Sequence, residues 1–93
     1  MDFFEEKDNY MIHVRIHQRN GRKYITTIEG IPRDLDLKKI LKYLRKIYST
    51  NGCIIYDDCE AVLQLQGDKR KDVLAAFTEW NIAPKENITV HCG

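Results

Sequence analysis

The residues of one short stretch have the types and the spacing that phosphate binding requires. Arg19, Arg22 and Lys23 surround the pair Asn20-Gly21, and residues 9–28 contain no acidic side chain. A guanidinium group can donate two parallel hydrogen bonds to phosphate oxygens, and lysine adds a compact positive charge. The stretch therefore predicts a phosphate-binding turn, with a merely solubilising hairpin tip as the alternative interpretation.

Two further clusters of cations lie in segments that we expect to be helical. The first cluster lies between Asp36 and Asp57, and no acidic residue occurs between these two positions. An exposed helix is normally stabilised by opposite charges four residues apart, and this segment has none. The second lies in the first turn of its helix, where positive charge is unfavourable beside the helix dipole. Both favour contact with an anionic partner, and a solvated helix face is the alternative for the first. The candidate residues are Lys38, Lys39, Lys42, Arg45, Lys46, Lys69, Arg70 and Lys71.

A dense acidic cluster falls between two expected strands. Asp57, Asp58 and Glu60 share one turn with Cys59, and four residues supply too few convergent oxygen atoms to hold a hard cation. The sequence also lacks a glycine-rich phosphate loop, a nucleophile elbow and an HExxH motif. We therefore expect no enzyme, no bound metal and no cofactor.

The three cysteines indicate no specific chemistry. Cys53, Cys59 and Cys92 are odd in number and lack CxxC spacing, so they do not predict a disulfide framework. His91 and Cys92 with Cys59 could approach a zinc ion, but a fourth ligand is missing. A nucleophilic thiol would need a base beside it, and the sequence does not bring His91 next to either Cys53 or Cys92. We expect structural or free thiols.

The hydrophobic pattern places these residues on five strands and two helices. Alternating apolar residues predict strands, and apolar residues three or four positions apart predict helices. Asn20-Gly21 predicts a tight hairpin; Asp34 or Asp36 is the expected N-cap of the first helix, and Asp68 that of the second. The expected strands span residues 12–17, 24–28, 53–56, 61–66 and 88–91.

Two details of the pattern require irregular backbone. Ile25 and Ile28 cannot both face one side of a regular strand, so a bulge is expected between them, near Thr26-Thr27. The first helix is expected to end within residues 49–52, with Asn51 or Gly52 in the left-handed conformation.

Each helix has one apolar stripe, so both helices can cover a single face of one sheet. The order ββαββαβ then indicates an α+β fold. We expect a two-layer sandwich of one mixed or antiparallel five-stranded sheet with two helices on one face. The stripes are Leu37, Ile40, Leu41, Leu44, Ile47 and Tyr48 in the first helix and Val73, Leu74, Phe77 and Trp80 in the second; Ile88 and Val90 face inward from the last strand.

The length and composition are those of a single soluble globular domain. The chain has 93 residues, of which 43% are hydrophobic and 31% charged, and no apolar run approaches the roughly 20 residues that span a bilayer. Residues 1–9 are expected to be a short acidic flexible tail, and residues 10–93 one domain. The first eight residues carry a net charge of −3, which leaves +4 on the remainder. With no basic, apolar leader at the start, a cytoplasmic protein is expected.

Several ordered segments resemble one known family. Residues 10–23, from Tyr10 through the Asn20-Gly21 turn to Lys23, are similar to the opening of the eukaryotic translation initiation factor one family. Residues 26–32 continue the similarity, and Asn51-Gly52 and residues 63–70 resemble later signatures of that family. Val90-His91 resembles its C-terminal end, so the resemblance extends over nearly the whole chain.

The resemblance implies a cytoplasmic, monomeric initiation factor that binds the small ribosomal subunit near the P site. Such factors promote scanning and enforce start-codon selection by opposing premature engagement of the initiator tRNA. Their partners are small-subunit rRNA and initiation factors two, three and five, and no membrane is involved. The implied rRNA-binding loop is Arg19, Asn20, Gly21, Arg22 and Lys23; the implied tRNA-facing turn is Asp57, Asp58, Cys59 and Glu60; and the two helical cation clusters are candidates for contact with rRNA or factors.

The sequence departs from the family pattern in three places. Lys69 replaces the usual glutamine, the turn at residues 57–60 is about one residue short, and the segment before Tyr10 is also short. Two alternative functions stay open. One is a reinitiation or tRNA-recruitment factor of the same fold, which a longer chain would favour; the other is a protein–protein adaptor that uses the lysine-rich helix.

Overall fold

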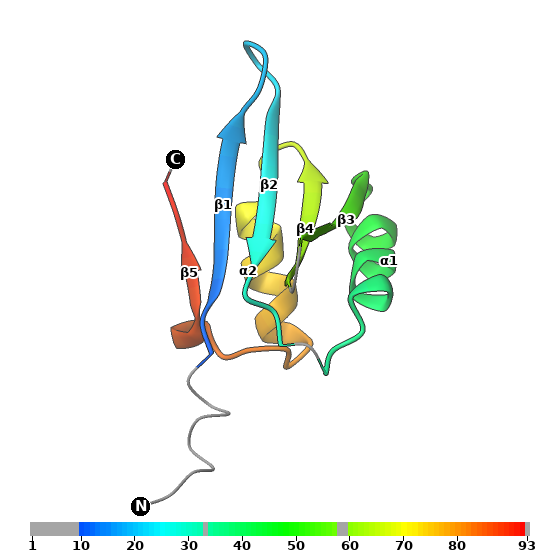
Figure 1. Cartoon of the computed structure of the whole chain (residues 1–93), viewed down its shortest axis with the longest axis vertical. Coiled ribbons are helices and arrows are strands. Elements are labelled where there is room, and N and C mark those ends of the chain that lie inside the picture. The colour runs from blue at the N-terminus through cyan, green and yellow to red at the C-terminus, as the bar shows by residue number, and fades with distance from the viewer. Residues whose placement is uncertain (1–9, 33, 58–59, 93) are drawn as a thin grey trace, which may run out of the picture.

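The computed structural model describes residues 10–32, 34–57 and 60–92. Their order of elements is ββαββαβ, as predicted, with a short 3-10 helix, η2, before the last strand (Figure 1). The acidic segment 1–9 lies outside the described residues. The elements are β1 (Ile12–Gln18), β2 (Tyr24–Glu29), α1 (Leu37–Tyr48), β3 (Gly52–Asp57), β4 (Glu60–Gln66), α2 (Arg70–Glu79), η2 (Lys85–Asn87) and β5 (Ile88–Val90).

The five strands form one mixed sheet in the order β3-β4-β2-β1-β5. The β1 and β5 strands are parallel, and the other neighbouring pairs are antiparallel. Alternate strand residues share one buried core with both helices, so the predicted two-layer α+β arrangement is confirmed. The core includes Ile12, Val14, Ile28, Leu63 and Leu65 from the sheet, Ile40, Leu41 and Leu44 from α1, and Val73, Ala76 and Phe77 from α2.

The expected bulge in β2 is absent, and that prediction was wrong. Strand β2 pairs without interruption with both β1 and β4. Thr26, rather than Ile25, joins Ile28 on the core side and is fully buried. Its hydroxyl donates a 2.8 Å hydrogen bond to the carbonyl of Gly67 and accepts one of 2.9 Å from the amide of Lys69. Because both partners are satisfied, a threonine is tolerated in the core, and Ile25 is buried on the opposite face.

The N-terminal end of α1 agrees with the prediction, and the C-terminal end does not. Asp36 is the N-cap, and its carboxylate accepts a 3.2 Å hydrogen bond from the amide of Lys39. The left-handed residue at the other end is Ser49, with φ 49°, and not Asn51 or Gly52. Gly52 serves close packing instead, since a Cβ atom there would lie 2.6 Å from the carbonyl oxygen of Gln64.

Three further expectations need correction. The N-cap of α2 is Lys69, one residue after Asp68, and it makes no side-chain capping bond. Ile47 is 53% exposed although it belongs to the apolar stripe of α1, because the end of α2 covers only part of that stripe. Val90 is also exposed, on the three-residue edge strand β5.

Candidate nucleic-acid interface

The loop between β1 and β2 is held in shape by its own hydrogen bonds. The amide of Arg19 donates to the carbonyl of Lys23 at 2.8 Å, and the amide of Lys23 donates to the carbonyl of Asn20 at 3.0 Å. The side-chain amide of Gln18 donates to the carbonyl of Gly21. Gly21 has φ 56°, which suits the first central position of a tight hairpin turn. The loop therefore presents its side chains from a defined backbone.

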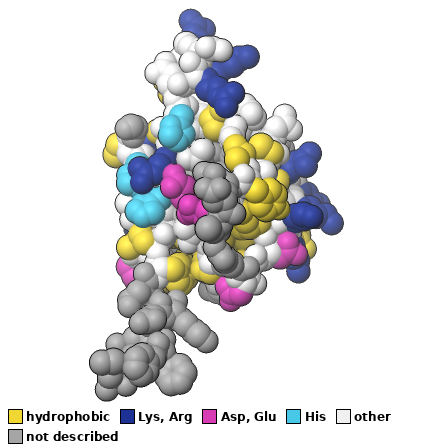
Figure 2. All heavy atoms as spheres, in the orientation of Figure 1, with side chains coloured by type: hydrophobic (Ala, Val, Ile, Leu, Met, Phe, Trp, Pro, Cys, Tyr) yellow, Lys and Arg dark blue, Asp and Glu magenta, His cyan; other side chains and the backbone are white. Residues whose placement is uncertain are grey.

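The cations of this loop are free to meet an external anion. Arg19, Arg22 and Lys23 are exposed, and within the described part of the chain none of them forms an ion pair. Arg15, lower on β1, differs because it contacts Glu29 at 3.1 Å. The loop extends beyond the ends of the other strands, and Figure 2 shows positive side chains gathered at its end. We refer to residues 19–23 as the basic tip.

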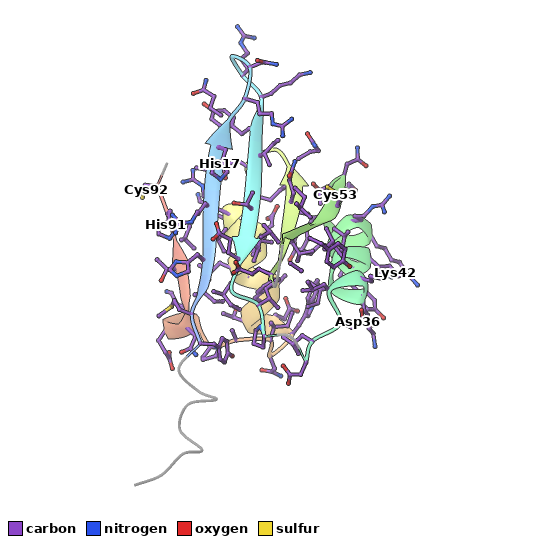
Figure 3. All side chains as sticks on the ribbon, viewed as in Figure 1. His17, Asp36, Lys42, Cys53, His91 and Cys92 are labelled. Atoms are coloured by element: carbon purple, nitrogen blue, oxygen red, sulfur yellow. The ribbon has the colours of Figure 1, made fainter. Side chains whose placement is uncertain are left out.

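The helix α1 carries the second cation cluster on its outer side. All five of its predicted cations are exposed, and among the described residues none pairs with a carboxylate. Lys42 points away from the body of the protein (Figure 3). A groove between α1 and β3 is lined by Lys38, Lys42, Arg45 and Lys46, whereas Lys39 borders a different groove, beside Trp80. The cluster thus offers four positive charges along one edge of the molecule.

The third cluster, at the start of α2, is partly committed to the fold. Arg70 forms a 2.8 Å ion pair with Asp68 and donates a 2.9 Å hydrogen bond to the carbonyl of His91. The hydrogen bond with Arg70 lowers the pKa of Asp68, and the same contact raises the pKa of Arg70. Lys69 is half-buried and Lys71 is exposed, so Lys71 is the most accessible cation of the three.

The acidic turn lies at the opposite end of the sheet from the basic tip. Gln66 of β4 pairs with Ile25 beside the tip, and β4 begins six residues earlier, at Glu60. At about 3.4 Å per residue, Glu60 is roughly 20 Å farther from the tip. Glu60 is exposed and is the cross-strand partner of Asp57; Asp58 and Cys59 lie outside the described residues. The protein is therefore positive at one end of the sheet and acidic at the other.

The thiols that the structure describes stand apart. Cys53 and Cys92 are exposed and unpaired, on β3 and after β5 (Figure 3). Cys59, the third potential zinc ligand, is not described. In residues 10–32, 34–57 and 60–92, no group of three or more His, Cys, Asp or Glu side chains could hold a metal ion.

A polar cluster on the sheet face opposite the helices was not identified from the sequence. His13 and His91 approach within 3.0 Å through their ring nitrogens, and Arg15 and Glu29 lie beside them. Burial lowers the pKa of His91, the positive charge of Arg15 and the proximity of His13 lower it further, and Glu29 opposes the shift. The alternation of His13 and Arg15 along β1 pointed to a solvent-facing side, but the contact with β5 depends on residues 78 positions apart.

Comparison with known proteins agrees with this geometry. Residues 8–83 match the family described as "Translation initiation factor SUI1". The chain belongs to this family. It is 47% identical over 88 residues to "Protein translation factor SUI1" of Eremothecium gossypii, an alignment covering 94% of this chain and 82% of that protein. It is 46% identical over 84 residues to "Eukaryotic translation initiation factor eIF-1" of Saccharomyces cerevisiae, covering 89% and 77% of the two chains. The predicted resemblance to initiation factor one is thus confirmed.

A solved structure shares the fold of this SUI1-family chain. The C-terminal domain of human eIF2D superposes with a TM-score of 0.71, covering 85% of this chain and 41% of that one. The sequence identity is 16%, so the similarity concerns the fold alone. In the described part of the chain, no helix is long and apolar enough to cross a membrane.

Proposed function

We propose that this SUI1-family factor binds small-subunit rRNA near the P site through its basic tip, promotes scanning, and opposes premature engagement of the initiator tRNA. It acts in the cytoplasm as a monomer and without catalysis. The observation that carries the proposal is the basic tip: three exposed cations at the end of an ordered hairpin, none of which forms an ion pair with another described residue.

The physical chemistry of rRNA suits such a tip. A-form RNA has a deep, narrow major groove that side chains cannot read, so proteins recognise its shape and its phosphates. A hairpin loop fixed by its own hydrogen bonds loses little conformational entropy on binding. Arg19 and Arg22 can each donate to two phosphate oxygens, and Lys23 adds a third charge. Each contact releases counterions from the RNA, which makes binding dependent on salt.

The outer side of α1 supplies a second surface. Four of its cations, which form no ion pair with another described residue, lie along a groove with β3 that suits either a phosphate backbone or an acidic segment of initiation factor two, three or five. Because these side chains are exposed and do not support the core, reversing their charge should weaken association and leave the fold intact. Contact with a factor through this surface alone would be the adaptor function, and it predicts no binding to bare small subunits.

The acidic turn suits a position facing the initiator tRNA. Its distance from the basic tip allows one end of the sheet to rest on rRNA while the other meets a second nucleic acid. Repulsion between an exposed carboxylate and the tRNA backbone is worth about 1 kcal/mol after solvent and salt screening. A bias of about 1.4 kcal/mol changes an equilibrium tenfold, so a cluster of acids is enough to influence codon choice.

The direct test is binding to purified small subunits without other factors. Changing Arg19, Arg22 and Lys23 together to alanine should weaken binding while the melting temperature stays unchanged. A matched control is Lys85→Ala, which removes one exposed cation from η2 at the far end of the β1–β5 side. If the triple variant binds as tightly as the control, the proposed rRNA contact is wrong.

Fidelity separates the roles of the two ends. Asp58→Lys combined with Glu60→Lys should raise initiation at UUG relative to AUG in a reporter assay while small-subunit binding stays intact. The tip variant should relax fidelity only together with weaker binding. Unchanged fidelity in a folded, ribosome-bound turn variant would show that the turn does not oppose tRNA.

A further inference from the structure

A second groove, next to α1 on the side away from β3, is apolar and open. Its aromatic and aliphatic walls are Tyr43 and Ile47 of α1, Trp80 at the C-cap of α2, and Ile82 in the segment that follows α2. Tyr43 is 42% exposed and Ile47 53% exposed, which is unusual for large apolar side chains that adjoin one another on a helix. Tyr43 and Trp80 meet edge to face, with ring centroids 6.2 Å apart. We refer to this feature as the Tyr43–Trp80 groove.

The shape and chemistry of the groove favour aromatic side chains with acidic neighbours. Aromatic rings prefer edge-to-face or offset contacts, and Tyr43 with Trp80 leaves ring surface open for another such contact. Lys39 and Asp36 both border the groove, whereas the other four cations of α1 line the separate groove beside β3. An occupant that combines phenyl rings with a carboxylate would therefore fill the apolar walls and pair with Lys39, the cation among the lining residues.

The N-terminal segment of the chain has this chemistry. Phe3 and Phe4 are followed directly by Glu5 and Glu6, and the first eight residues carry a net charge of −3. They are the only large aromatic residues before Tyr10. The segment 1–9 is not described by the structure, but its point of attachment is.

The segment joins the domain beside the groove. The hydroxyl of Tyr10 donates a 3.2 Å hydrogen bond to the carbonyl of Ile82, a residue that lines the groove. The side-chain amide of Asn87 donates to the carbonyl of Tyr10 at 3.2 Å, so Tyr10 is fixed at both its ring and its backbone. The ring of the first described residue therefore reaches the Ile82 wall of the Tyr43–Trp80 groove, while its backbone lies beside Asn87.

The length of the segment is sufficient. From Tyr10 to Phe4 the extended chain spans about 20 Å, at roughly 3.3 Å per residue. Helix α1 has 12 residues and is about 18 Å long at 1.5 Å per residue. The segment is therefore about as long as the helix that forms one side of the groove. A short tether also raises the local concentration of the segment to the millimolar range, so weak contacts are enough.

We propose that residues 1–9 dock in the Tyr43–Trp80 groove of the same chain, with Phe3 and Phe4 against its rings and Glu5 and Glu6 beside Lys39. The docked segment covers exposed apolar surface and reduces the positive charge next to α1. A partner that binds this side of α1 must first displace it. The docking goes beyond the proposed ribosomal function and does not depend on it.

NMR of the full-length protein tests the docking without any partner. Changing Phe3 and Phe4 together to serine should shift the indole N–H resonance of Trp80, the single tryptophan, and the amide of Ile47, and leave the basic tip unshifted. The reverse experiment is Tyr43→Ser, which should shift the amides of residues 2–6. A matched control is Tyr56→Ser, because this exposed tyrosine on β3 lies outside the groove.

Each outcome decides the proposal. Intramolecular docking is supported if both experiments produce the expected chemical-shift changes. These changes should not depend on protein concentration, and they should become smaller as salt is added. Shifts that disappear on dilution would assign the groove to a second copy of the chain and overturn the proposal. It would equally be overturned if the phenylalanine changes left Trp80 and Ile47 unshifted, or if Tyr56→Ser moved the segment as much as Tyr43→Ser.

Discussion

The buried hydroxyl of Thr26 should contribute measurably to stability although threonine is polar. Thr26→Val keeps the shape of the side chain and removes only the oxygen. The carbonyl of Gly67 and the amide of Lys69, 41 and 43 residues along the chain from Thr26, then lose this partly buried hydrogen-bond partner. Together with the 2.7 Å hydrogen bond from the amide of Gly67 to the carbonyl of Tyr24, this hydroxyl ties β2 to the connection between β4 and α2.

The magnitude follows from the two hydrogen bonds. A typical protein hydrogen bond contributes about 1 kcal/mol net, so the substitution should lower the free energy of unfolding by about 2 kcal/mol. For a domain of this size, that loss lowers the melting temperature by roughly 8–16 °C. Both values are upper bounds, because the added valine methyl group is fully buried and offsets roughly 0.8 kcal/mol of the loss.

The assay is urea unfolding with a matched neighbour as control. Thr27→Val makes the same chemical change on the opposite sheet face, where the hydroxyl lies 3.2 Å from the Nε2 atom of His17. It should change stability by less than about 0.5 kcal/mol, as expected for surface substitutions. Equal stability of the two variants would refute the argument that Thr26 anchors the start of α2.

Two further predictions concern packing and pH. Gly52→Ala would place its Cβ atom 2.6 Å from the carbonyl oxygen of Gln64 and 2.7 Å from the Cδ2 atom of Leu65. Such overpacking should lower the free energy of unfolding, measured with urea, by roughly 1–3 kcal/mol. A variant as stable as the wild-type protein would show that β3 can shift to make room. Because the pKa of His91 is lowered in the folded protein, the unfolded chain binds a proton at His91 more readily than the folded one. The neutral imidazole therefore contributes to stability above pH 6.5, and this contribution is lost as the pH falls below that value. His91→Gln should remove this part of the pH dependence of the melting temperature, and an unchanged profile would contradict it.

The fold was predictable from the sequence because its signals are local. Alternating apolar residues in β1 and β4 and the apolar stripes of α1 and α2 each specify an element and the face that it buries. The N-cap at Asp36 and the turn at Gly21 depend on a few neighbouring residues, so they were predicted as well. The strand order β3-β4-β2-β1-β5 was not predicted, because it depends on which distant strands pair.

The errors occur where a distant segment decides the environment. Thr26 is buried because the β4–α2 connection supplies its hydrogen-bond partners, and no local pattern contains that information. A glycine is needed at residue 52 because the backbone of β4 passes too close for a Cβ atom. The sequence around the end of α1 does not show this contact. The sequence predicted that Arg70 is a cation available to a partner, but its guanidinium donates a hydrogen bond to the carbonyl of His91, next to β5.

The candidate site divides in the same way. The exposure of the basic tip follows from the turn sequence, since side chains at a hairpin end have no neighbours to bury them. The Tyr43–Trp80 groove could not be predicted, because it depends on how far the end of α2 covers the stripe of α1. Ile47 belongs to that stripe by spacing and is left uncovered by the packing.

The salt dependence of binding to purified small subunits is the most direct test of the rRNA contact. If Arg19, Arg22 and Lys23 each neutralise one phosphate, changing all three to alanine should reduce the slope of log K against log salt by about three. Over a fourfold rise in salt, the wild-type protein should therefore lose roughly 60-fold more affinity than the variant, while Lys85→Ala keeps nearly the wild-type slope. Equal slopes for the wild-type protein and the triple variant would contradict the account.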